Sequence, residues 1–146
     1  MSHLRLSRVY ELINNLWSEH IAFHVEALTD DKLEFTANVS LKGCDDDILI
    51  DTVVYDSGTI HLFLKFDFLD PTERNLKLVN DFNVNSSWAK AEITPGKNRT
   101  YLEIHYAFVS SLDEEDAADN VDFALKDVVS DNTERLLAPL AAVTTR

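Results

Sequence analysis

The chain has 146 residues, the size of one ordinary domain, and a domain of this length buries roughly two-thirds of the surface that its unfolded chain exposes. Its 13 basic and 26 acidic residues give a net charge of −13, which repels nucleic-acid phosphates and anionic lipids. We therefore expect no binding to nucleic acid or to a membrane surface. With 45% apolar residues the chain has the material for a core, and we predict a single domain over residues 1–146.

The charge and the cysteine content also indicate a compartment. An acidic balance keeps a protein soluble, and it favours basic or amphipathic protein partners. Cys44 is the single cysteine, so the sequence predicts neither an intramolecular disulfide nor a cysteine-based zinc cluster. The N-terminal segment has no continuous apolar stretch followed by a cleavage site, and no apolar run approaches the ~18 residues of a membrane span. We expect a cytoplasmic protein.

The first half of the sequence predicts one helix followed by four strands. Apolar residues between Leu6 and Trp17 recur at helical spacing and form one broad stripe. From Ile21 the period changes to two, because apolar and polar residues alternate, which is typical of half-buried strands. The strands are expected at residues 21–27, 33–41, 48–55 and 59–68. Their short connecting turns predict an antiparallel meander.

A second helix, two strands and a third helix complete the expected order. Asp70 is predicted to cap the second helix, with Pro71 at its first position and Glu73 completing a capping box. Strands are expected at residues 87–94 and 100–109. The segment Ser111–Glu114 reads as another capping box, which opens a long C-terminal helix. The predicted fold class is α+β, in the order α-β-β-β-β-α-β-β-α.

Motifs for catalysis or metal binding are weak in this sequence. His20 and His24 have the spacing of zinc ligands on a helix, but no glutamate follows His20 and the local pattern is already that of a strand. The acidic turn 45–47 lacks the glycine and the distal glutamate of a calcium loop. The chain has only three glycines, widely spaced, so no phosphate-binding loop is indicated. We predict a non-enzymatic protein with no catalytic residue, no metal ligand and no cofactor.

Polar residues gather where the second helix is expected to end, in the stretch NDFNVNSSWAKAEI. Asn83 falls within the apolar arc of that helix, and Asn80 lies just outside it. A buried asparagine is costly unless it is hydrogen-bonded, and a helix end leaves backbone carbonyls in need of partners. We therefore predict that Asn80 and Asn83 form a structural junction with the helix end or the next strand, in preference to a catalytic site.

The same stretch carries a family resemblance. The helix end Asn80–Asn83, the residues Trp88 and Lys90 with Ala91, and the strand Leu102–His105 resemble the C-terminal half of the YbjN-like proteins, which are proposed bacterial sensory transduction regulators. The resemblance extends from about residue 48 to residue 137. Phe82, Ser87 and His105 stand where that family usually has a tryptophan, a basic residue and an acid.

The resemblance has implications for fold and function. It implies the fold of type III secretion chaperones, which is one twisted antiparallel sheet with helices packed on one face, in proteins that are small, acidic and often dimeric. It brings no catalytic residues with it. We therefore predict a protein-binding module, chaperone-like or regulatory, with a protein partner of unknown identity and a possible homodimer.

The polar side of the sheet supplies a candidate protein-contact face, where aromatic side chains stand among charged ones, as they do in protein interfaces. Its predicted residues are His61, Phe63, Lys65, Trp88, Lys90, Glu103 and His105, with His24 and Glu26 on the same side. Two alternatives remain open at this stage. One is a small-molecule- or metal-binding domain that uses the strand histidines, and the other is an acidic immunity or antitoxin-type inhibitor.

Overall fold

A computed structural model describes residues 3–17, 21–39, 48–67, 72–86, 89–95, 100–128 and 136 of the chain. Within these residues the elements follow the predicted α-β-β-β-β-α-β-β-α order, so the α+β class is confirmed. The helices are α1 (Leu6–Trp17), α2 (Glu73–Asn85) and α3 (Glu114–Val128). The strands are β1 (Ala22–Leu28), β2 (Lys32–Val39), β3 (Ile48–Tyr55), β4 (Thr59–Asp67), β5 (Ala89–Pro95) and β6 (Thr100–Val109).

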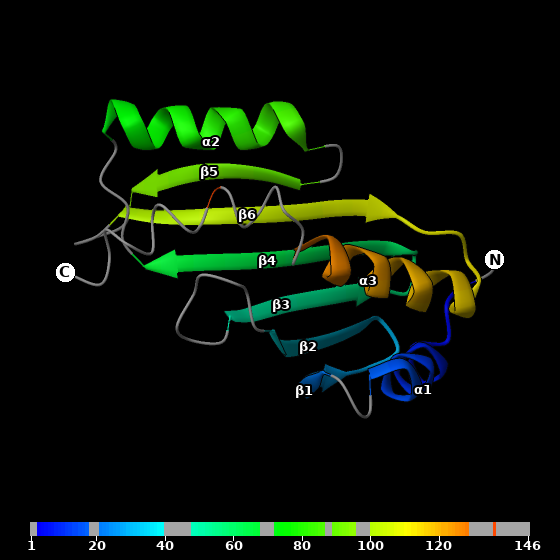
Figure 1. Cartoon of the computed structure of the whole chain (residues 1–146). Coiled ribbons are helices and arrows are strands. Elements are labelled where there is room, and N and C mark those ends of the chain that lie inside the picture. The colour runs from blue at the N-terminus through cyan, green and yellow to red at the C-terminus, as the bar shows by residue number, and fades with distance from the viewer. Residues whose placement is uncertain are drawn as a thin grey trace.

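The strands form one six-stranded antiparallel sheet in the order β1-β2-β3-β4-β6-β5 (Figure 1). The first four strands make the expected meander. The chain then crosses through α2, so that β6 pairs with β4 and β5 becomes an edge strand. This crossover brings β4 and β6 together, although about 40 residues separate their paired positions, such as Phe63 and His105.

The core lies between one face of the sheet and the helices α1 and α3. Alternation places apolar side chains of every central strand on this face, because successive strand residues point to opposite sides. The largest fully buried side chains are Trp17, Tyr106, Phe35, Ile13, Leu33, Ile50, Ile60, Leu62, Leu64, Leu102 and Ile104. The helix α1 packs against α3, β1 and β2, whereas α2 runs along the β5 edge of the sheet (Figure 1).

Both predicted capping boxes are wrong in detail. The N-cap of α2 is Thr72, whose hydroxyl accepts a hydrogen bond from the backbone N–H of Asn75 at 3.2 Å. The helix therefore begins two residues later than Asp70 and Pro71 would have started it, and those two residues lie outside the described part of the chain. The cap of α3 is Asp113, whose Oδ1 accepts from the N–H groups of Glu115 and Asp116 at 2.9 and 3.1 Å. A carboxylate at this position also interacts favourably with the helix dipole.

The turn between β3 and β4 requires a glycine. Gly58 has a φ of +93°, and its carbonyl accepts a hydrogen bond from the N–H of Ser110 at 2.8 Å. A Cβ on this residue would lie 2.7 Å from the carbonyl oxygen of Ser110. The turn therefore tolerates neither the backbone conformation nor the volume of another residue.

We expect Gly58→Ala to lower the free energy of unfolding by about 1–2 kcal/mol, because a left-handed backbone costs roughly that much for a residue with a Cβ. Ser57→Ala, a change at the exposed neighbouring position, should alter it by less than about 0.5 kcal/mol. Urea denaturation of the two variants beside the wild type measures the difference. Equal stabilities for all three proteins would contradict the expectation.

Among the described residues, no helix combines the length and the apolar character needed to cross a lipid bilayer.

Candidate functional site

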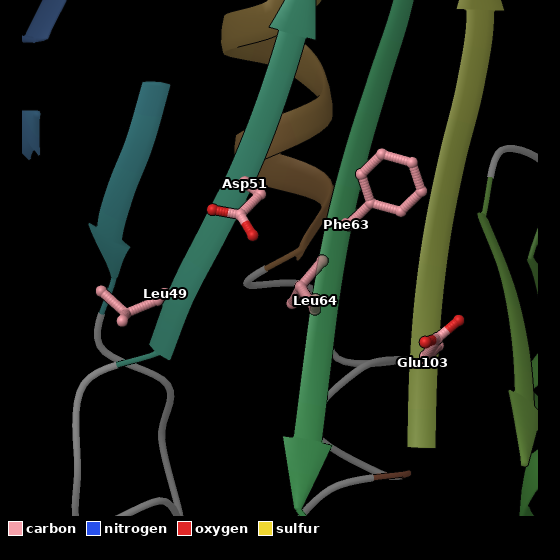
Figure 2. A pocket seen from close by; sticks show the side chains of 5 residues that line it. All are labelled: Leu49, Asp51, Phe63, Leu64 and Glu103. Atoms are coloured by element: carbon pink, nitrogen blue, oxygen red, sulfur yellow. The ribbon is translucent and has the colours of Figure 1, made fainter. Parts of the chain in front are cut away.

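The second face of the sheet carries no described helix, and we call it the open face. Its residues on the three central strands alternate with the core residues, and they are exposed or half-buried. On β3, β4 and β6 the face includes Leu49, Asp51, Val53, Tyr55, His61, Phe63, Glu103 and His105. Figure 2 looks onto this face, with α3 behind the strands.

Four rings meet near the middle of the open face, and we call Tyr55, His61, Phe63 and His105 the ring cluster. Phe63 lies directly opposite His105 in the β4–β6 register, and their rings stack with centroids 4.4 Å apart and an angle of 11° between their planes. Tyr55 meets His61 edge to face, at 6.2 Å and 89°. Contacts between stacked or edge-to-face aromatic rings each contribute about 0.5–1.5 kcal/mol beyond simple burial.

The two histidines of the ring cluster are hydrogen-bonded to each other. Nδ1 of His61 lies 2.9 Å from Nε2 of His105, and the planes of the two rings differ by only 15°. Their centroids are 5.2 Å apart, which is the separation expected when two rings lie end to end along a short N–H···N bond. The imidazoles are therefore nearly coplanar, and the two bonded nitrogens point at each other.

An open depression of about 380 Å³ adjoins the ring cluster. It is bordered by Leu49 and Asp51 from β3, Phe63 and Leu64 from β4, and Glu103 from β6 (Figure 2). Leu49 is 59% exposed, and the Asp51 carboxylate accepts a hydrogen bond from the hydroxyl of Thr36 at 2.9 Å. Apolar side chains and carboxylates therefore share one hollow on the open face.

The pKa of His105 lies below its ordinary value of 6.5. Burial is the main cause, since it disfavours the charged imidazolium, and the neighbouring His61 lowers the pKa further. Glu103 and Glu92 act in the opposite direction, because their negative charges favour the protonated ring. The net direction shows that the ring cluster favours a neutral His105.

This direction predicts how stability responds to acid. The unfolded chain takes up a proton on His105 first as the pH falls, because the pKa in the folded chain is the lower one. The contribution of His105 to stability is therefore complete above about pH 6.5 and is lost as the pH falls through the folded pKa. We expect the free energy of unfolding of the wild type, relative to that of His105→Asn, to fall between pH 7.5 and pH 5.5. Urea denaturation of both proteins measures this difference. A difference that stays constant, or that moves in favour of the wild type, would contradict this expectation.

Of the predicted contact residues Lys65, Trp88 and Lys90, the structure describes only Lys90 in full. Lys90 is turned towards the end of α2, where its ammonium group donates to the carbonyls of Asn83 and Ser86 at 3.2 and 3.4 Å. Trp88 lies outside the described residues, and of Lys65 the backbone is described but not the side chain. In the register, Lys65 is opposite Glu103. Lys90 therefore stabilises the C-terminal end of α2, where a positive charge is favourable.

Among the described histidines considered for metal binding, only His61 and His105 are brought together. His24 is exposed on β1, at the far side of the sheet from β6, and His20 lies outside the described residues. No group of three or more histidine, cysteine, aspartate or glutamate side chains in the described part of the chain is placed to hold a metal ion. Cys44 and the acidic turn 45–47 also lie outside that part.

Of the two asparagines predicted to form a structural junction, Asn83 makes the predicted hydrogen bonds. The amide of Asn83 donates to the carbonyl of Ala91 at 2.9 Å, and its Oδ1 accepts from the N–H of the same residue at 2.7 Å. Asn80 is exposed on α2. Asn83 therefore pairs with the edge strand β5 as a neighbouring strand would, and it anchors α2 to that edge.

The outward residues of β3 were absent from the predicted face. Leu49, Asp51 and Tyr55 lie on β3, where alternation alone places them opposite the core. The strand ILIDTVVY has apolar residues on both sides, so its apolar residues alone do not show which side faces outward. Their outward direction was readable from the period of two, but their closeness to β4 and β6 residues depends on the strand order.

Comparison with known proteins gives the fold a class, which is YbjN-like. The chain is similar to the crystal structure of YbjN from E. coli, described as a candidate transcription regulator, with a TM-score of 0.56 over 92% of this chain and 91% of that chain. The sequences are 16% identical, so the likeness is one of fold. No family model and no curated protein matches the sequence. The predicted YbjN-like fold is therefore confirmed.

Proposed function

We propose that this chain is a non-enzymatic protein-binding module, chaperone-like or regulatory, that holds its partner on the open face of the sheet. The observation that carries the proposal is the ring cluster, which stands in the middle of a sheet face that no described helix covers. A face built for solvation alone would not need four contacting rings. Aromatic side chains among charges are typical of the cores of protein interfaces.

The exposure of the apolar side chains supports this proposal. Phe63 and Tyr55 are each 39% exposed, and Leu49 is 59% exposed. In the register Phe63 is opposite Asp51, one outward position from Leu49, and Tyr55 is linked to Phe63 through the ring of His61. A monomeric protein gains nothing from contiguous exposed apolar surface, whereas a binding protein uses it for affinity.

The net charge bears on the kind of partner. YbjN is described as a candidate transcription regulator, which favours a regulatory role. A net charge of −13 disfavours direct contact with nucleic-acid phosphates. We therefore propose that any regulation by this chain works through another polypeptide. A second copy of the chain is one such partner, and an immunity or antitoxin-type role would use the same face.

Affinity purification with two matched variants tests the proposal. Phe63→Arg places a charge in the ring cluster, whereas Val84→Arg places the same charge on α2, where Val84 is 75% exposed and away from the open face. The wild type and Val84→Arg should retain the same protein, and Phe63→Arg should lose it. Light scattering of the three purified chains shows whether that protein is a second copy. Retention by Phe63→Arg, or no reproducible partner and a monomeric wild type, would refute the proposal.

A metal- or small-molecule-binding function is the second candidate, and the 2.9 Å contact between His61 and His105 favours it. Two imidazoles can hold a transition metal if a partner or solvent completes the coordination. Thermal denaturation with zinc, nickel and copper salts tests this candidate. Stabilisation by a metal in the wild type but not in His61→Ala would establish it, and no shift in either protein would remove it.

A further inference from the structure

We propose that the His61–His105 pair is a proton-operated latch on the open face: it stays closed with no added proton or with one, and it opens when both rings are protonated. The closed latch holds the ring cluster in the arrangement to which the partner binds. This consequence for binding rests on the function proposed above. The behaviour of the pair itself follows from its geometry.

The hydrogen bond between the two rings determines how many added protons the closed pair can hold. A neutral imidazole has one N–H group and one lone pair. The bond between Nδ1 of His61 and Nε2 of His105 uses the N–H of one ring and the lone pair of the other. A first added proton binds the outer nitrogen of the donor ring, so the bond survives and becomes charge-assisted. A second proton binds the lone pair that accepts the bond, and the bond is lost.

Because the two rings are nearly coplanar, loss of the hydrogen bond forces them apart. With both rings protonated, two N–H groups would face each other across 2.9 Å, where there is no room for two hydrogens along one line. Two positive charges would also repel each other at that distance. The rings must therefore separate, and a rotation of either side chain achieves this because both are only partly buried.

The neighbouring charges shape the two protonation steps. On β6, Glu103 is two residues from His105, and on β5, Lys90 is opposite His105 while Glu92 is opposite Glu103. Glu103 and Glu92 favour the first proton. The ammonium of Lys90 is held by carbonyls at the end of α2, and Asp51 on β3 is opposite Phe63. These charges are mixed in sign, so the repulsion between the two imidazolium groups dominates the second step.

Opening the latch changes the surface that a partner meets. His105 stacks on Phe63 at 4.4 Å, and Tyr55 meets the edge of His61, so separation of the histidines disturbs both contacts. The cluster loses its fixed shape and gains positive charge at the same time. A partner that fits the closed cluster is therefore released when the second proton binds.

Nuclear magnetic resonance of the imidazole nitrogens tests the latch on the full-length chain. Between pH 8 and pH 4, the nitrogens of His61 and His105 should titrate together in two steps separated by more than about one pH unit, as strongly coupled groups do. The resonance frequencies of the Phe63 ring protons should change at the lower-pH step. In His105→Asn, which cannot form a doubly protonated pair, the ring signals of Phe63 should show no such step. Independent titration of the two histidines, or a Phe63 signal that ignores the lower step, would overturn the proposal.

The second arm connects the latch to binding. The protein retained by the wild-type chain in the affinity purification serves as the probe, and its binding is followed across the same pH range. The midpoint of its loss should coincide with the lower step of the titration. Loss at another pH, or no loss, would show that the latch does not govern binding. If no partner is retained at any pH, the proposed function fails while the titration still decides the latch.

Discussion

Replacing Trp17 with alanine should lower the free energy of unfolding by about 3–5 kcal/mol, the cost of removing a buried tryptophan from a packed core. Trp17 is only 1% exposed, and its ring meets Phe23 and Phe35 edge to face, each at 5.6 Å. Its Nε1 donates to Oδ1 of Asp122 at 2.9 Å, which ties α1 to α3. The substitution therefore removes ring packing and an interhelical hydrogen bond together. A typical domain has about 5–15 kcal/mol of stability in total, so the loss is a large fraction.

Trp17→Phe separates the two contributions. The smaller ring keeps most of the packing but cannot donate to Asp122, whose other carboxylate oxygen lies 2.7 Å from the ammonium of Lys126. Since that carboxylate keeps one partner, the variant should lose about 1–2 kcal/mol, mostly from the missing hydrogen bond and the smaller ring. Urea denaturation followed by circular dichroism measures all three proteins. A loss below about 1 kcal/mol in Trp17→Ala would show that the core does not depend on this residue.

The periodicity of the sequence was sufficient to predict the elements. On β2, Leu33, Phe35 and Ala37 alternate with polar residues, and the structure buries all three while their neighbours stay accessible. On α1, the buried residues Leu6, Val9 and Ile13 keep the expected helical spacing. Hydrophobic burial dictates these patterns locally, because a strand or helix must turn its apolar side to the core.

The ring cluster could be predicted only in part. Alternation placed His61, Phe63 and His105 on the polar side of their strands, but it does not say which strands are neighbours. The pairing of β4 with β6 follows a crossover through α2 and β5, so the contact between His61 and His105 is a consequence of topology. The helix N-caps were predicted wrongly for a different reason. The segment before α3 offers both Ser111 and Asp113 as caps, and the backbone path selects between them.

Replacing Asn83 with alanine is the substitution outside the core with the largest expected effect, about 2–4 kcal/mol. Its side chain satisfies both the N–H and the carbonyl of Ala91, which is 4% exposed, at 2.7 and 2.9 Å. A buried backbone group left without a partner costs about 1–3 kcal/mol, and here two such groups are left. The better helix propensity of alanine offsets only about 0.7 kcal/mol of this cost.

The same change should also expose the edge of the sheet. With Asn83 removed, α2 is held less firmly on β5, and where it separates from the strand the outward N–H and carbonyl of Ala91 become available to a strand from another molecule, which promotes association through β5. Asn80→Ala, on the exposed side of the same helix, is the matched control and should change stability by less than about 0.5 kcal/mol. Asn83→Asp keeps an acceptor for the N–H of Ala91 but has no donor for its carbonyl, so it should fall between the two. Urea denaturation ranks the three variants, and light scattering detects the association. If Asn83→Ala were as stable and as monodisperse as Asn80→Ala, Asn83 would not be what closes this edge of the sheet.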